Sequence, residues 1–62
     1  MAGRGEVIFE FQRRGAYVKV SAVDVATGTE VSIVGDPAAG ETALRRIAAR
    51  KLVYVLAKQK EK

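Results

Sequence analysis

The stretch from residue 40 to residue 59 constrains the fold more than any other, because its apolar residues recur at three- and four-residue spacing. That period is typical of an amphipathic helix with one buried face. We therefore expect a helix over 40–59, with Tyr54 at the edge of its core face. The residues expected on the buried face are Leu44, Ile47, Ala48, Leu52, Val55 and Leu56.

Two helix starts are compatible with the preceding loop. Asp36 could cap a helix that has Pro37 at its first position. Alternatively, a turn could precede a helix that begins at Gly40 or Glu41, and glycine is a poor residue in a helix interior. The glycine at position 40 favours the later start.

The rest of the chain reads as three strands, expected over residues 6–12, 17–24 and 29–34. Apolar and polar residues alternate in these segments, and turn-forming sequences containing Gly15 and Gly28 separate them. We predict an α+β fold, a three-stranded antiparallel meander covered on one face by the C-terminal helix (β-β-β-α). One domain accounts for residues 1–62.

The strand alternation also predicts a register. In the first hairpin a four-residue turn over 13–16 pairs Phe11 with Val18, Phe9 with Val20 and Val7 with Ala22, and sets Glu10 opposite Lys19. In the second hairpin, Val31 pairs with Ala22 and Ile33 with Val20, which sets Ser21 opposite Ser32.

The sequence offers little for catalysis or for metal and cofactor binding. It contains no Cys and no His, and no acidic cluster stands out. Enzymes usually rely on a positioned base, nucleophile or metal ion. We expect no enzymatic activity, no catalytic or metal-binding residues, no cofactor and no small-molecule substrate.

The location follows from hydropathy. No long apolar segment of the signal-peptide kind opens the chain, and no run of about 18 apolar residues could span a membrane. We expect a cytoplasmic protein that does not bind membranes.

Two surfaces could bind partners. The expected outer sheet face carries apolar residues that suggest a homodimer or protein partner, namely Ile8, Tyr17, Val23 and Val34. The net charge of +4 is concentrated at the C-terminal end, where residues 41–62 contain seven cations and two anions. A nucleic acid is the alternative partner, and its expected contacts are Arg45, Arg46, Arg50 and Lys58. A basic helix face can also serve solubility alone.

Four segments resemble a family of short bacterial proteins of unknown function, found mainly in alphaproteobacteria, some of which have a serum-resistance label. The segments are Glu6-Val7-Ile8-Phe9-Glu10-Phe11, Tyr17-Val18-Lys19-Val20-Ser21-Ala22, Ala26-Thr27-Gly28-Thr29-Glu30-Val31-Ser32-Ile33-Val34-Gly35 and Arg50-Lys51-Leu52-Val53-Tyr54-Val55-Leu56-Ala57. The resemblance implies a bacterial protein and brings no functional residues with it.

Overall fold

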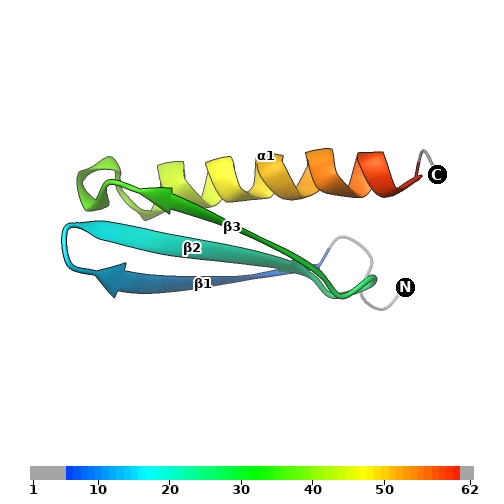
Figure 1. The fold of residues 1–62 in the computed structure, drawn as a ribbon, viewed down its shortest axis with the longest axis horizontal. Helices are drawn as coiled ribbons and strands as arrows, with labels where there is room; N and C mark the ends of the chain where they lie inside the picture. Colours follow the sequence, from blue (N-terminus) through cyan, green and yellow to red (C-terminus); the bar gives the residue numbers. More distant parts are fainter. Residues whose placement is uncertain (1–5, 61–62) are drawn as a thin grey trace.

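Three strands and one long helix follow one another along the chain, as the periodicity predicted. The computed structural model describes residues 6–60. The strands form an antiparallel sheet of order β1-β2-β3, and α1 covers one of its faces (Figure 1). The fold is therefore β-β-β-α, of the α+β class. The elements are β1 (Val7–Arg14), β2 (Tyr17–Asp24), β3 (Thr29–Gly35), the 3-10 helix η1 (Pro37–Ala39) and α1 (Glu41–Lys60).

The first hairpin differs from the predicted register by two residues. Arg14 pairs with Tyr17, so the loop contains only Gly15 and Ala16. Gly15 has a φ of 60° and Ala16 has a negative φ, which fits a two-residue hairpin turn with glycine at its first central position. β1 consequently extends to Arg14 instead of ending at residue 12.

The shift keeps the predicted face of each side chain but changes its partners. Phe9 lies opposite Ala22 and Phe11 opposite Val20. Glu10 lies opposite Ser21, so the predicted pairing of Glu10 with Lys19 is wrong. A slip of two residues leaves every side chain on its original face because the side-chain period of a strand is two.

The second hairpin has the predicted register, with Val20 opposite Ile33 and Ala22 opposite Val31. Its turn is held by Asp24, whose buried carboxylate accepts hydrogen bonds from the Thr27 amide at 3.2 Å and the Thr27 hydroxyl at 2.7 Å. An aspartate early in a turn commonly stabilises it in this way.

Both predicted helix starts are used in part. Asp36 caps η1, where its carboxylate accepts a hydrogen bond from the Ala38 amide at 2.9 Å, and Pro37 is the first residue of η1. The long helix begins separately at Glu41, after Gly40 at a φ of 88°. The later start is therefore the correct one for α1.

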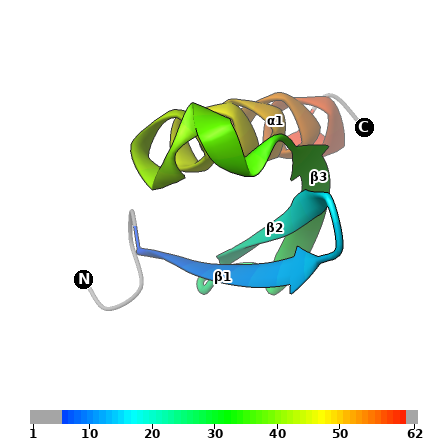
Figure 2. The same ribbon diagram turned by 90° about the vertical axis from the view of Figure 1, so that its left-hand side faces the viewer.

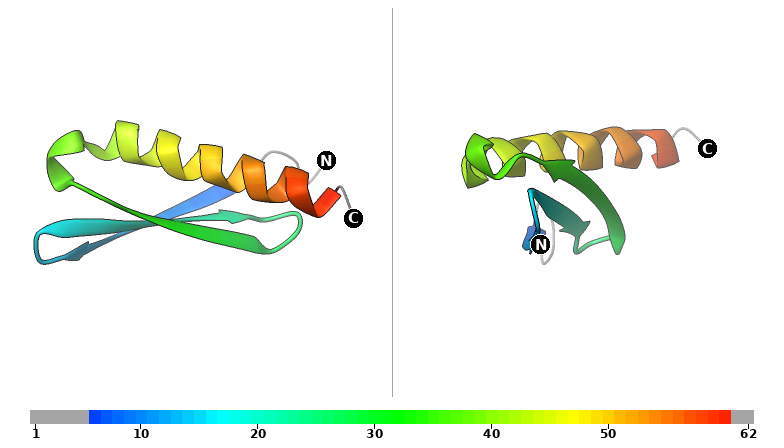
Figure 3. Two further views of the ribbon diagram at one scale, coloured as in Figure 1. Left: turned by 45° about the horizontal axis from the view of Figure 1, so that its top comes forward. Right: turned by 60° about the vertical axis from the view of Figure 1, so that its left-hand side comes forward.

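The helix lies off the centre of the sheet. α1 packs on β3 and β2, and the end-on view shows β1 as the strand farthest from the helix (Figure 2). The strands twist beneath the helix along its length (Figure 3). The buried core consists of Val20, Ala22, Val31, Leu44, Ala48 and Leu52. Half-buried residues packed against it are Val7, Phe9, Phe11, Val18, Ile33, Val55 and Leu56.

Two residues expected in or beside the core are instead exposed. Ile47 has 51% of its surface accessible and Tyr54 63%. Both lie on the same side of α1 as Lys51, whose ammonium group donates to the Ser32 carbonyl of the edge strand β3 at 2.9 Å. A three-stranded sheet is narrow, so this side of α1 projects past its edge.

At the last residue of β3, α1 lies very close to the sheet. Gly35 lies against the buried side chain of Leu44, and a Cβ atom at position 35 would collide with that side chain. Glycine is favoured here by this close approach and not by the backbone conformation, because Gly35 is not among the glycines with a positive φ.

Candidate functional site

The sheet face that points away from α1, here called the outer face, contains the four apolar residues predicted to bind a partner. Ile8 is 56% exposed and Val34 63%; Tyr17 is exposed and Val23 half-buried. Ile8 on β1 pairs with Val23 on β2. Val34 on β3 pairs with Lys19 on β2, and Tyr17 is the next residue along β2 on the same face, so Val34 and Tyr17 are diagonal neighbours. The structure thus separates the predicted patch into two apolar pairs.

A polar row divides these pairs. Glu10, Ser21 and Ser32 lie side by side across the three strands. The two serine hydroxyls are 3.2 Å apart and hydrogen-bonded, and Ser21 is only 7% exposed. This confirms the predicted cross-strand pairing.

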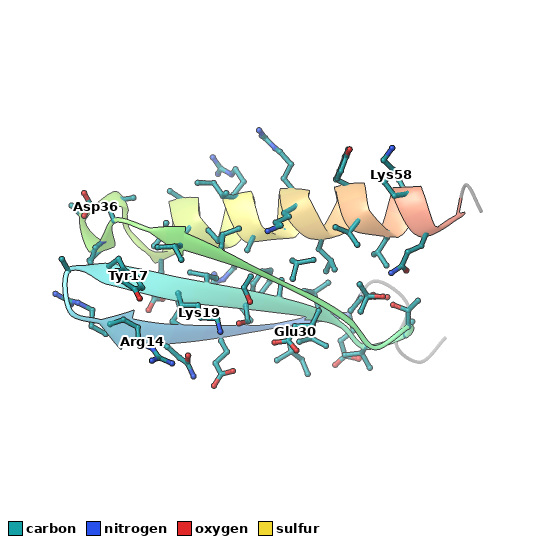
Figure 4. The ribbon with its side chains drawn as sticks, viewed as in Figure 1. Arg14, Tyr17, Lys19, Glu30, Asp36 and Lys58 are labelled. Atoms are coloured by element: carbon teal, nitrogen blue, oxygen red, sulfur yellow. The ribbon has the colours of Figure 1, made fainter. Side chains whose placement is uncertain are left out.

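The outer face also divides by charge along the strands. Glu10 and Glu30 lie on the half that contains Ile8 and Val23, here called the acidic half. The basic half contains Arg14 and Lys19 together with Gln12, Tyr17 and Val34. Figure 4 shows Arg14 and Tyr17 toward the β1–β2 turn and Glu30 nearer the opposite end, with Lys19 between them.

The cations of α1 do not form one stripe. Arg45 pairs with Glu41 at 3.8 Å, and its guanidinium carbon lies 5.6 Å from the ring centre of Phe9 and 5.7 Å from that of Phe11. Arg45 therefore faces β1.

The other predicted nucleic-acid contacts point elsewhere. The Lys58 ammonium lies 5.8 Å from the ring centre of Tyr54, near the C-terminal end of α1 (Figure 4). Arg46 and Arg50 are exposed one helical turn apart, and neither has an ion pair within residues 6–60. Of the four predicted contacts, Arg46 and Arg50 therefore remain as an open cationic pair.

The side of β1 that faces the helix is incompletely covered. Phe9 and Phe11 are half-buried, with Arg45 above their rings. A hollow of about 290 Å³ opens at the turn end of this region. It is lined by Phe11, Arg13, Val18, Pro37, Glu41 and Leu44. The sequence pattern did not reveal this region, because periodicity gives the buried face of a helix but not its position across the sheet.

A second hollow, of about 250 Å³, lies at the other end of the molecule. Asp24, Thr27, Leu56 and Gln59 line it. Asp24 is already bonded to Thr27 within the turn, and Gln59 accepts from the Thr29 hydroxyl at 3.3 Å. These polar groups serve to join the turn to α1.

Neither metal-binding nor membrane-spanning elements occur in the part of the chain that the structure describes. Residues 6–60 contain no group of three or more acidic, His or Cys side chains able to hold a metal ion. Among these residues, α1 is not apolar enough over its length to cross a bilayer.

Comparison with known families identifies the chain. Residues 4–59 match a family described as a domain of unknown function, DUF6898. The chain belongs to the DUF6898 family. No curated protein and no solved structure matches it significantly.

The DUF6898 match agrees with the resemblance to a family of unknown function. Its description names neither a group of bacteria nor serum resistance, so these two parts of the resemblance stay expectations. For DUF6898, function has to be argued from the surfaces of the fold.

Proposed function

We propose that this DUF6898 protein is a non-enzymatic interaction module that self-associates through the outer face of its sheet. The observation that carries the proposal is the division of that face into an acidic and a basic half, each with its own apolar pair. A face of this kind is complementary to a second copy of itself.

The geometry of the dimer follows from this complementarity. Two outer faces stack with their strands antiparallel, about a twofold axis that runs across the strands between Glu10 and Gln12. The axis brings Val23 over the partner's Tyr17 and Glu10 beside the partner's Lys19. The acidic half of each copy then covers the basic half of the other.

The association is expected to be weak. Three strands about 4.8 Å apart and about 25 Å long present roughly 350 Å² per copy, well below the ~800 Å² per partner of a stable interface. A dissociation constant on the order of tens of micromolar is the expected range.

Two substitutions of one exposed residue test the arrangement. Val34 lies in the basic half on β3, so it meets the partner's acidic half, which contains Glu30. Val34→Glu places a carboxylate against the partner's acidic half and should raise the dissociation constant at least about tenfold. Val34→Lys places a cation there and should change the dissociation constant by less than about threefold. Sedimentation equilibrium measures both.

The two variants control for each other, because both remove the same exposed apolar side chain and differ only in charge. Equal masses for Val34→Glu and Val34→Lys at every concentration would contradict the stacked arrangement. Circular dichroism should show that both variants keep the wild-type fold.

A second candidate function, nucleic-acid binding, is supported by the exposed pair of Arg46 and Arg50. Two phosphate contacts predict a slope of about −1.8 for the logarithm of affinity against the logarithm of salt concentration on duplex DNA. Fluorescence anisotropy of a labelled duplex measures this slope. The double variant Arg46→Ala/Arg50→Ala should lose duplex binding if this function is correct. The control Lys58→Ala should bind the duplex as the wild type does. Under the self-association proposal, no duplex binding is expected at ~0.15 M salt.

A further inference from the structure

The two edges of the sheet differ in how they are protected. β1 and β3 are both edge strands. On β3 the Ser32 carbonyl is already occupied by Lys51 at 2.9 Å. Lysine at an edge is a common device against strand pairing. β1 contains neither lysine nor proline, and its charged residue on the helix-facing side, Arg13, lies next to the turn, away from Phe9.

Within residues 6–60, the outer edge of β1 presents in a regular series backbone hydrogen-bonding groups that pair with no other strand. Arg14 and Tyr17 flank a two-residue turn, so they form a hydrogen-bonded pair, as in hairpins of this kind. Because alternate residues of an antiparallel strand bond to opposite sides, Phe9, Phe11 and Arg13 direct their N–H and C=O groups away from β2.

The apolar face of β1 is also unfinished. Phe9 and Phe11 are only half-buried because α1 lies over β2 and β3. The cation above them, Arg45, is paired with Glu41, and Arg13 lies beside Phe11 at the turn end of the same face. Two large aromatic residues beside an open edge are expected to gain from further burial.

We infer that the β1 edge is where two copies of this chain join, strand to antiparallel strand, about a twofold axis at Phe11. The pairing extends the three-stranded sheet into one continuous sheet with both helices on the same face. The phenylalanines of both copies then fill the space between the two helices.

The sequence of β1 favours this register. Its acid, Glu10, lies in the first half of the strand, and its cations, Arg13 and Arg14, lie at the end. Centring on Phe11 sets Glu10 opposite the partner's Gln12 and diagonal to the partner's Arg14. A centre at Glu10 would instead oppose two carboxylates.

This inference does not rest on the outer face, which stays accessible when the edges pair. The twofold axis of the edge lies at the level of Phe11, and so does the axis proposed for the outer face. Both contacts can therefore form together in a closed assembly of four chains.

Hydrogen exchange measured by NMR on the Val34→Glu variant tests the edge without the outer face. As the concentration rises to ~1 mM, the amides of Phe9, Phe11 and Arg13 should become protected, whereas that of Val7, which has no strand partner in this register, should not. A monomer of 6.7 kDa throughout, with fast exchange at these three amides, would overturn the inference and leave the outer-face proposal standing.

A matched pair of variants tests the same contact through the backbone. The Arg13 N–H points away from β2, so Arg13→Pro removes no backbone hydrogen bond between the strands while blocking the edge. Arg13→Pro and Arg13→Ala both remove the hydrogen bond from Arg13 Nε to the Gly15 carbonyl, so the two variants are matched in that loss. In the Val34→Glu background it should raise the dissociation constant at least about tenfold, through loss of two symmetry-related hydrogen bonds. Arg13→Ala keeps the amide and should raise it less than about fivefold. Equal effects of the two variants would contradict strand pairing.

Discussion

Replacing Leu52 by alanine is expected to lower the free energy of unfolding by ~2–5 kcal/mol. Leu52 is 1% exposed and lies in the core between α1 and the sheet. Truncation removes apolar contacts and leaves a cavity that rigid strands on one side cannot close. A domain of this size has a total stability of about 3–9 kcal/mol, so much of it depends on this one side chain. Urea unfolding followed by circular dichroism measures the change.

Ile47→Ala is the matched control for Leu52→Ala. Ile47 is on the same helix but is 51% exposed, beside the β3 edge. Its truncation should change the free energy of unfolding by less than about 0.5 kcal/mol. Equal losses for the two variants would show that α1 presents a different face to the sheet.

Gly35→Ala is expected to destabilise the protein by ~1–3 kcal/mol, although alanine is usually more stable than glycine within a strand. The added Cβ would meet Leu44, which is 3% exposed and cannot move into solvent. Since ~1 kcal/mol corresponds to roughly 4–8 °C for a small domain, thermal unfolding should show a clear decrease in Tm.

A double-mutant cycle separates this collision from other effects of the substitution. In Leu44→Ala the space beside Gly35 is open, so adding Gly35→Ala to that variant should cost little or partly fill the cavity. The expected coupling between the two positions is ~1–2 kcal/mol. Additive losses would mean that the cost of Gly35→Ala arises elsewhere.

Sequence periodicity was sufficient for the elements and their faces. The three strands, the β2–β3 register and the inward side of Leu44, Ala48 and Leu52 follow from spacing alone. These features are local: each depends on a period of two or about 3.6 residues and on turn glycines. The α+β class follows directly from them.

Side-chain periodicity did not determine the β1–β2 register. Pairings that differ by two residues bury the same side chains, so the choice depended on whether the turn has two or four residues. The error mattered for function. In the predicted register Glu10 and Lys19 neutralise each other, whereas in the structure acids and bases occupy different halves of the outer face.

The lateral position of α1 was likewise beyond the sequence pattern. It depends on the width of the sheet and on the close contact of Gly35 with Leu44, neither of which periodicity describes. As a result, the exposure of Ile47 and Tyr54 and the partial cover of Phe9 and Phe11 became visible only in three dimensions.

The order of the elements also bears on how the chain folds. Each strand pairs with the one before it, and α1 packs mainly on the two strands that precede it, with no crossover between elements. The contacts within the two hairpins close small loops, which favours fast folding, whereas α1 reaches its strands across longer separations. The β2–β3 hairpin and α1 contain all six residues of the buried core, so they can form a folding nucleus before β1 joins. β1 would then be the last strand to dock and the first to detach.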